Sequence, residues 1–184
     1  MALIAPPSLE EVDGELRAEY ESGRVRFAHL DQLRRVLMRF PAAFRAADGM
    51  YFLIMERGRL DRELKEVIFV ACSGVRECRY GLAAHGGWLI EHTGLAPSEV
   101  ESLARGEDLT RQSESQRALL AFARKVAGAA YRTVEQDIET LRGAGFDTPT
   151  IVEALTVVSL SGWMNGYADA LGLDAAEVVG KVAP

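Results

Sequence analysis

Apolar residues recur three or four positions apart along most of the chain, beginning near residue 28. Leu30, Leu33 and Leu37 form one such series, and Phe44 and Ala47 begin the next. This spacing puts apolar side chains on one face of an α-helix, and the alternating pattern typical of a β-strand does not persist anywhere. The pattern therefore predicts an all-α fold.

Helix boundaries are marked by proline, capping pairs and glycine. Pro41 suits the first turn of a helix, and three Ser/Thr positions are followed three residues later by Glu or Gln, at Ser98/Glu101, Ser113/Gln116 and Thr133/Gln136. Glycines follow several periodic segments, where a left-handed residue commonly ends a helix, at Gly94, Gly145 and Gly172. About seven or eight helices are expected, near residues 28–39, 41–57, 61–73, 78–93, 98–105, 113–129, 134–143 and 149–171.

The chain of 184 residues is long enough for one well-packed core and short for two domains. Residues 1–24 contain Pro6 and Pro7, an excess of acidic residues and little apolar periodicity beyond a helix-like stretch around residues 9–20. We interpret residues 1–24 as an N-terminal extension and residues 25–184 as one helical domain.

The segment 150–171 is apolar on almost every face, unlike an amphipathic surface helix. Its whole circumference should therefore be covered. In a domain of this size a partner subunit is a natural source of part of that cover, so we expect a homo-oligomer.

Composition narrows the function. Apolar residues make up 48% and charged residues 26%, with 21 basic against 27 acidic residues and a net charge of -6. Without a basic cluster, nucleic acid is not expected as a partner. The start of the chain lacks a basic signal-peptide region, which favours a cytoplasmic location. The longest uncharged stretch, residues 154–168, falls short of the roughly 20 residues of a membrane span, so no membrane partner is expected.

The most informative stretch runs from Glu63 to His85. An apolar helix, a short turn near Val75 and a second helix starting near Cys78 together predict an antiparallel hairpin. Residues whose numbers sum to about 151 then lie opposite one another, so Glu66 faces His85. A carboxylate beside an imidazole can fix its tautomer and raise its basicity, as in a proton relay.

Cys78 is the second candidate for chemistry in this stretch. A helix N-terminus and the flanking Arg76 and Arg79 should stabilise a thiolate and lower the pKa of Cys78 below the reference of about 8.5. The apolar neighbours of Cys72 should instead raise its pKa. Cys78 precedes His85 by two helical turns, roughly 10 Å, which makes direct contact between them doubtful. A purely structural role for Cys78 is the alternative.

Four residues of this stretch, Glu66, Cys78, Gly81 and His85, fall on the signature positions of the carboxymuconolactone decarboxylase and alkylhydroperoxidase D (AhpD) superfamily, which the chain resembles. In AhpD a helix carrying Glu leads into Cys-x-x-Cys-x-x-x-His. The resemblance implies an all-helical AhpD-like domain, a proton relay of Glu66 and His85, and a reactive Cys78.

The departure from this signature is Gly81, which stands where AhpD has the second cysteine of its redox pair. Three hypotheses follow. The first is a hydroperoxide reductase that uses Cys78 with an external thiol. The second is a cofactor-free lyase or isomerase that acts on a small carboxylic acid, with His85 as general acid/base. The third is a non-catalytic oligomeric relative. We expect Gly81 to leave space for a ligand atom beside His85, with Trp88 either lining that pocket or filling the core. The sequence has no metal-ligand spacing and no phosphate-binding glycine loop, so neither a metal nor a cofactor is expected.

Overall fold

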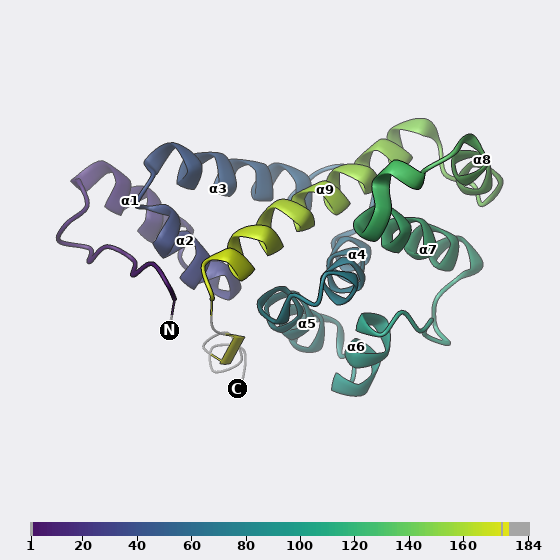
Figure 1. Cartoon of the computed structure of the whole chain (residues 1–184), viewed down its shortest axis with the longest axis horizontal. Coiled ribbons are helices and arrows are strands. Elements are labelled where there is room, and N and C mark those ends of the chain that lie inside the picture. Colours follow the sequence, from purple (N-terminus) through teal and green to yellow (C-terminus); the bar gives the residue numbers. More distant parts are fainter. Residues whose placement is uncertain (1, 174, 177–184) are drawn as a thin grey trace.

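The computed structural model describes residues 2–173 and 175–176, and the regular elements in this part of the chain are all helices, with no strand (Figure 1). Two 3-10 turns, η1 (Ala28–Leu30) and η2 (Ala130–Arg132), accompany the α-helices. The all-α prediction is confirmed. The helices are α1 (Gly14–Gly23), α2 (Asp31–Leu37), α3 (Pro41–Glu56), α4 (Arg62–Val75), α5 (Arg79–Thr93), α6 (Pro97–Ala104), α7 (Glu114–Ala129), α8 (Glu135–Gly143) and α9 (Thr148–Ala170).

Several predicted helix boundaries hold. Pro41 begins α3, and Ser113 caps α7 by accepting a hydrogen bond from Gln116 N while the Gln116 side chain accepts one from Ser113 N. Gly94, Gly145 and Gly172 all have positive φ, as expected of residues that end helices.

Two predicted capping pairs are wrong by one or two residues. At α6 the Glu99 side chain accepts from Ala96 N, so Ser98 and Glu101 do not form the cap. At α8 the Asp137 side chain accepts from Val134 N, one residue beyond the predicted Thr133 pair. In both places an alternative acidic residue three positions after an extended residue satisfies the first free N–H groups of the helix.

The centre of the molecule is α4, which is surrounded by α5, α6, α7 and α9 (Figure 1). Its residues Ile68, Phe69 and Val70 are completely buried, as a helix inside a bundle requires. The turn after α4 returns the chain as α5, so the two helices form the expected hairpin. The long helix α9 crosses the molecule and links α1–α3 at one end with α7 and α8 at the other.

The N-terminal residues are packed into the same core as the rest. Leu16 and Tyr20 of α1 are 1% and 3% exposed and belong to the one hydrophobic cluster of the described chain. Leu3 N donates a hydrogen bond to Leu171 O, which ties the start of the chain to the end of α9.

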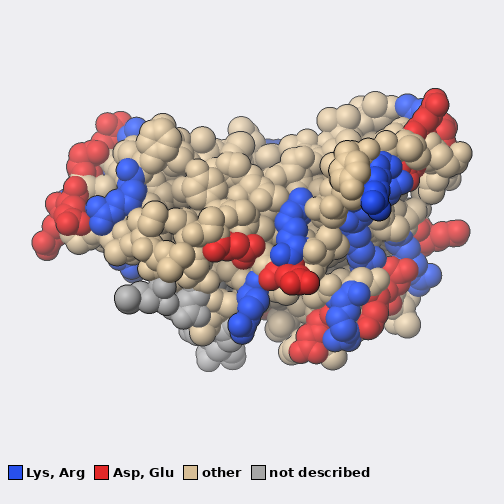
Figure 2. Space-filling model, viewed as in Figure 1, with Lys and Arg blue, Asp and Glu red and all other residues tan. Residues whose placement is uncertain are grey.

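The expected all-round cover of α9 is not complete within one chain. Its inner face is buried, but Val152 is 54% exposed, and Thr156 and Ser159 on the same side are also exposed. On the surface, acidic and basic side chains are interspersed beside broad uncharged areas, without a basic patch on the face shown (Figure 2). Among the described helices, none has the length and apolar character needed to cross a membrane.

Candidate active site

The α4–α5 hairpin brings Glu66 and His85 into direct contact. Glu66 Oε2 lies 2.5 Å from His85 Nδ1, and the two residues are 0% and 1% exposed. The predicted register of the hairpin is therefore confirmed at this pair. Phe69, one turn after Glu66 on α4, stacks on the imidazole with ring centroids 3.7 Å apart and so fixes the plane of the ring.

Glu66 is held as a carboxylate by its contacts with His85 and Arg62. Burial alone would raise its pKa, but the contact with His85 and the charge of Arg62 outweigh burial and lower the pKa to about 2. Arg62 Nε and Nη2 lie 2.7 and 2.5 Å from Glu66 Oε1, and Arg62 also pairs with Glu56 nearer the surface. Because an ionised carboxylate can only accept, Nδ1 of His85 carries the proton that it donates to Glu66, and Nε2 is the ring nitrogen left for other partners.

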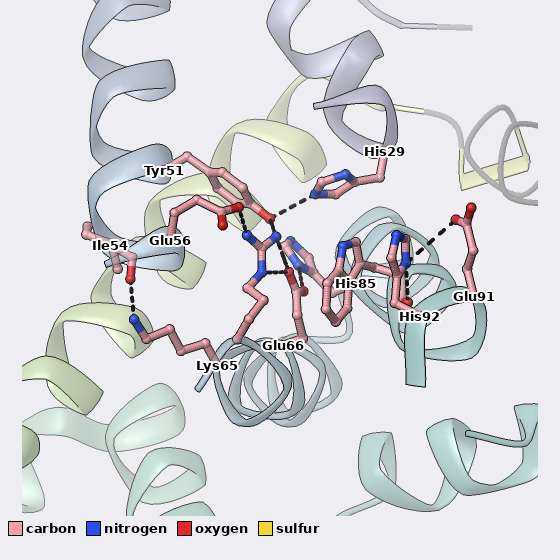
Figure 3. Close-up of polar contacts among 11 residues, drawn as sticks. His29, Tyr51, Ile54, Glu56, Lys65, Glu66, His85, Glu91 and His92 are labelled. Carbon is pink, nitrogen blue, oxygen red and sulfur yellow. Dashed lines mark hydrogen bonds and ion pairs between the residues drawn. The ribbon is translucent and has the colours of Figure 1, made fainter. Parts of the chain in front are cut away.

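Tyr51 of α3 and His29 of η1 complete the cluster (Figure 3). The Tyr51 hydroxyl lies 2.8 Å from His29 Nε2, 3.0 Å from Arg62 Nη2 and 3.4 Å from Glu66 Oε1. Burial lowers the pKa of His29 to about 3 and raises that of Tyr51 well above its ordinary value, so both are neutral. Sequence reasoning missed both residues, because Tyr51 looked like one more apolar position and His29 stood outside any pattern.

Cys78 is the N-cap of α5, where its Sγ accepts from Gly81 N at 3.4 Å. The expectation of a lowered pKa is wrong. Cys78 is 0% exposed, and burial, with a further contribution from Asp169, raises its pKa to about 12 despite the helix N-terminus. Arg76 lies 3.4 Å from Ser161 and lowers the pKa of Cys72 instead, although burial still raises the Cys72 pKa to about 11.

The space expected beside Gly81 is filled. A Cβ atom at residue 81 would lie 2.5 Å from Ser73 Oγ and closer still to Asn165 Oδ1, both well inside normal contact. Ser73 and Asn165 are buried and hydrogen-bonded to each other, with Asn165 Nδ2 donating to Ser73 Oγ at 3.0 Å. A polar pair therefore occupies the volume that a second cysteine side chain would need.

Trp88 stands between the cluster and the surface. It is half-buried, the Arg62 guanidinium lies 5.0 Å from its ring, and the ring stacks on that of the exposed His92 with centroids 4.5 Å apart. The cavities between α4 and the start of α7 and between α3 and α9 are lined by other residues and include neither Glu66 nor His85.

Three residues of the cluster have side chains suited to a metal. Ligand atoms of His29, Glu66 and His85 lie within 4.8 Å of one another. His29 Nε2, both Glu66 oxygens and His85 Nδ1, however, are already within hydrogen-bonding distance of Tyr51, Arg62 or one another, and the fixed charge of Arg62 beside Glu66 would repel a cation. We interpret the cluster as a hydrogen-bond network.

The model of the carboxymuconolactone decarboxylase family matches residues 41–125, which include α4 and α5 with Glu66 and His85. This central part of the chain is similar to the carboxymuconolactone decarboxylase family. The matched region contains the complete Glu66–His85 pair, whereas His29 lies outside it. No match was found among curated protein sequences.

Solved structures share the AhpD-like fold over nearly the whole chain. A peroxidase-related protein from Silicibacter sp. TM1040 is 23% identical, with a TM-score of 0.86 over 98% of this chain and 94% of that one. A peroxidase-related protein with an AhpD core from Ralstonia eutropha JMP134 is 24% identical, with a TM-score of 0.85 over 100% and 97%. The debrominase Bmp8, in complex with 2,3,4-tribromopyrrole, is 15% identical, with a TM-score of 0.79 over 98% and 97%. At these identities the likeness establishes the fold.

Proposed function

We propose that this chain is a cofactor-free acid–base enzyme, a lyase or isomerase acting on a small carboxylic acid, with His85 as the catalytic residue. One observation carries the proposal: a buried, ionised Glu66 bonded at 2.5 Å to His85 Nδ1. This arrangement leaves Nε2 as the base and stabilises the imidazolium that forms when it takes a proton. The name of the family supports the same reaction class.

In an isomerase reaction Nε2 of His85 takes a proton from a substrate carbon next to a carbonyl group, the electrons of the broken C–H bond move into the carbonyl, and Nε2 returns the proton at another carbon of the same conjugated system. In a decarboxylase reaction the electrons of the breaking C–CO2 bond move into the carbonyl system as CO2 leaves, and the protonated Nε2 then delivers the proton that replaces it, so neither reaction needs an oxidant. Since His85 is only 1% exposed, substrate entry requires a side chain to move. Trp88, one turn further along α5 and half-buried, is the residue best placed to do so.

Hydrogen exchange into substrate tests this mechanism. The protein is incubated in D2O with a panel of small carboxylic acids that includes carboxymuconolactone, and deuterium uptake and CO2 release are followed. His85→Gln should reduce any activity by at least about 100-fold, the usual contribution of a general base. His92→Gln, which changes an exposed histidine, is the matched control. Equal activity in wild type and His85→Gln would refute the proposal.

A thiol-dependent hydroperoxide reductase is the second candidate, favoured by the position of Cys78 at a helix N-terminus and by the peroxidase-related relatives. A Cys78 thiolate would take one oxygen from the hydroperoxide, giving a sulfenic acid and an alcohol, and an external thiol would reduce the sulfenic acid. Burial of Cys78 and its raised pKa give this reaction less support than the acid–base reaction receives.

The same protein preparation separates the candidates. Peroxide loss that requires added thiol and disappears in Cys78→Ser, but persists in Cys72→Ser, would establish the reductase. Deuterium uptake that disappears in His85→Gln and persists in Cys78→Ser would establish the acid–base enzyme. Inactivity in both assays would leave a non-catalytic oligomeric relative as the best interpretation.

A further inference from the structure

Tyr51 and His29 form a second branch of hydrogen bonds at the Glu66 carboxylate, beside the His85 ring. In Figure 3 Tyr51 points toward the carboxylate and His29 points toward the Tyr51 hydroxyl, both from elements other than the α4–α5 hairpin. The branch runs from Arg62 Nη2 to the Tyr51 hydroxyl at 3.0 Å and from there to His29 Nε2 at 2.8 Å. His29 precedes the part of the chain that matches the family model, so the N-terminal segment contributes to the site.

The protons of this branch can be placed by counting donors. A guanidinium can only donate, so the Tyr51 oxygen accepts from Arg62. The single Tyr51 proton points either to Glu66 Oε1 at 3.4 Å, in which case His29 Nε2 donates to the Tyr51 oxygen at 2.8 Å, or to His29 Nε2, which then accepts it. A neutral His29 that accepts at Nε2 must carry its own proton on Nδ1.

The consequence for Glu66 follows from the Arg62 contacts. Nη2 of Arg62 is shared between Tyr51 and Glu66, and Nε bonds Glu66 as well. With Nη2 fixed by Tyr51, the guanidinium plane keeps both nitrogens on Glu66 Oε1, which leaves Oε2 free for His85. Ring contacts restrict Tyr51 further, since Phe27 meets its edge at 5.7 Å and Arg62 lies 5.4 Å over its face.

We propose that Tyr51 and His29 are positioning residues, which act through Arg62 to hold the Glu66 carboxylate on Nδ1 of His85. The role in catalysis rests on the proposed acid–base function, but the hydrogen bond itself can be measured without substrate. Tyr51→Phe removes the hydroxyl and keeps the ring. His29→Leu removes the hydrogen-bond partner of the Tyr51 hydroxyl, whereas His29→Gln offers an amide that can either accept from Tyr51 or donate to it.

The test is nitrogen-15 NMR of the histidine rings in the full-length protein, with the His85 signals assigned by their loss in His85→Gln. In wild type the Nδ1 proton of His85 should exchange slowly with water and identify a single tautomer. Loss of one supporting hydrogen bond should speed that exchange about three- to tenfold in Tyr51→Phe and in His29→Leu. His29→Gln should restore nearly the wild-type rate. Tyr20→Phe is the matched control, because it removes another buried tyrosine hydroxyl, one bonded to Asp31.

Unchanged exchange and tautomer of His85 in a folded Tyr51→Phe would overturn the proposal. Should that variant not fold, as judged by circular dichroism, equal exchange rates in His29→Leu and His29→Gln would overturn it equally well. Failure of the proposed function gives a different result, because deuterium exchange into substrate would then be absent in wild type or equal in His85→Gln, whatever the NMR of the Tyr51 and His29 variants shows.

Discussion

Gly81→Ala is the sharpest test of how the site is packed. In an ordinary exposed helix position, replacing Gly by Ala stabilises a protein by about 0.5–1 kcal/mol. At residue 81 the new Cβ would lie 2.5 Å from Ser73 Oγ and closer to Asn165 Oδ1, inside a buried hydrogen-bonded pair. Overpacking of this kind costs about 1–3 kcal/mol. The helix gain offsets only part of this, so we expect a net loss of about 1–2 kcal/mol.

Thermal unfolding measures this loss directly. For a chain of 184 residues each kcal/mol corresponds to about 2–4 °C, so Gly81→Ala should lower the Tm by about 2–8 °C. Gly49→Ala is the matched control, since Gly49 is exposed in α3 and a Cβ atom added there would have no neighbouring atom within 4 Å, so this change should raise the Tm slightly. The double variant Gly81→Ala/Asn165→Ala should lose less than the sum of its single variants. A Gly81→Ala protein as stable as Gly49→Ala would refute the reasoning.

Three further predictions address the charges, the thiols and the surface. Glu66→Gln should destabilise the protein by about 3 kcal/mol near pH 7 because it leaves Arg62 and His85 without their buried partner. Folding lowers the pKa of Glu66 from 4.5 to about 2, so the difference in free energy of unfolding between wild type and variant, measured in urea, should shrink as the pH falls from about 4.5 to about 2. The native thiols should react with a disulfide reagent at pH 8 far more slowly than the thiols of the protein unfolded in urea. The reason is that a rise in pKa from 9.0 to about 12 reduces the Cys78 thiolate roughly 1,000-fold. Rapid labelling of native Cys78 would contradict this prediction. We also propose a homo-oligomer formed through the exposed apolar side of α3 and α9, so sedimentation should show more than one chain per particle, and Leu53→Lys with Val152→Lys should give a monomer.

The parts of the fold that depend on local pattern were predictable. Helix limits at Pro41, Ser113 and Gly94 follow from backbone chemistry within a few residues, and they agree with the structure. The contact of Glu66 with His85 was also predictable, because a short turn fixes which residues of two antiparallel helices face each other.

Features that depend on distant segments were not predictable from local pattern. His29 and Tyr51 lie near Glu66 only because η1 and α3 pack onto the hairpin. The positions of His29 and Tyr51 in the sequence do not indicate this packing. The pKa of Cys78 was predicted wrongly for the same reason. The helix N-terminus is a local effect, whereas burial beneath α9, with Asn165 O 4.0 Å from the sulfur, is a tertiary effect and the larger one.

The position of the second cysteine and the Glu66–His85 pair, the two parts of the family's signature, have separate surroundings in this structure. At residue 81 there is no free volume for a cysteine side chain, because Ser73 and Asn165 fill it. Restoring the thiol would therefore require changes on α4 and α9 as well as on α5. The Glu66–His85 pair uses none of those atoms and is instead supported from α3 and η1 through Arg62, Tyr51 and His29. The absence of the dithiol leaves these contacts untouched, which is why the proposed function is acid–base chemistry at His85.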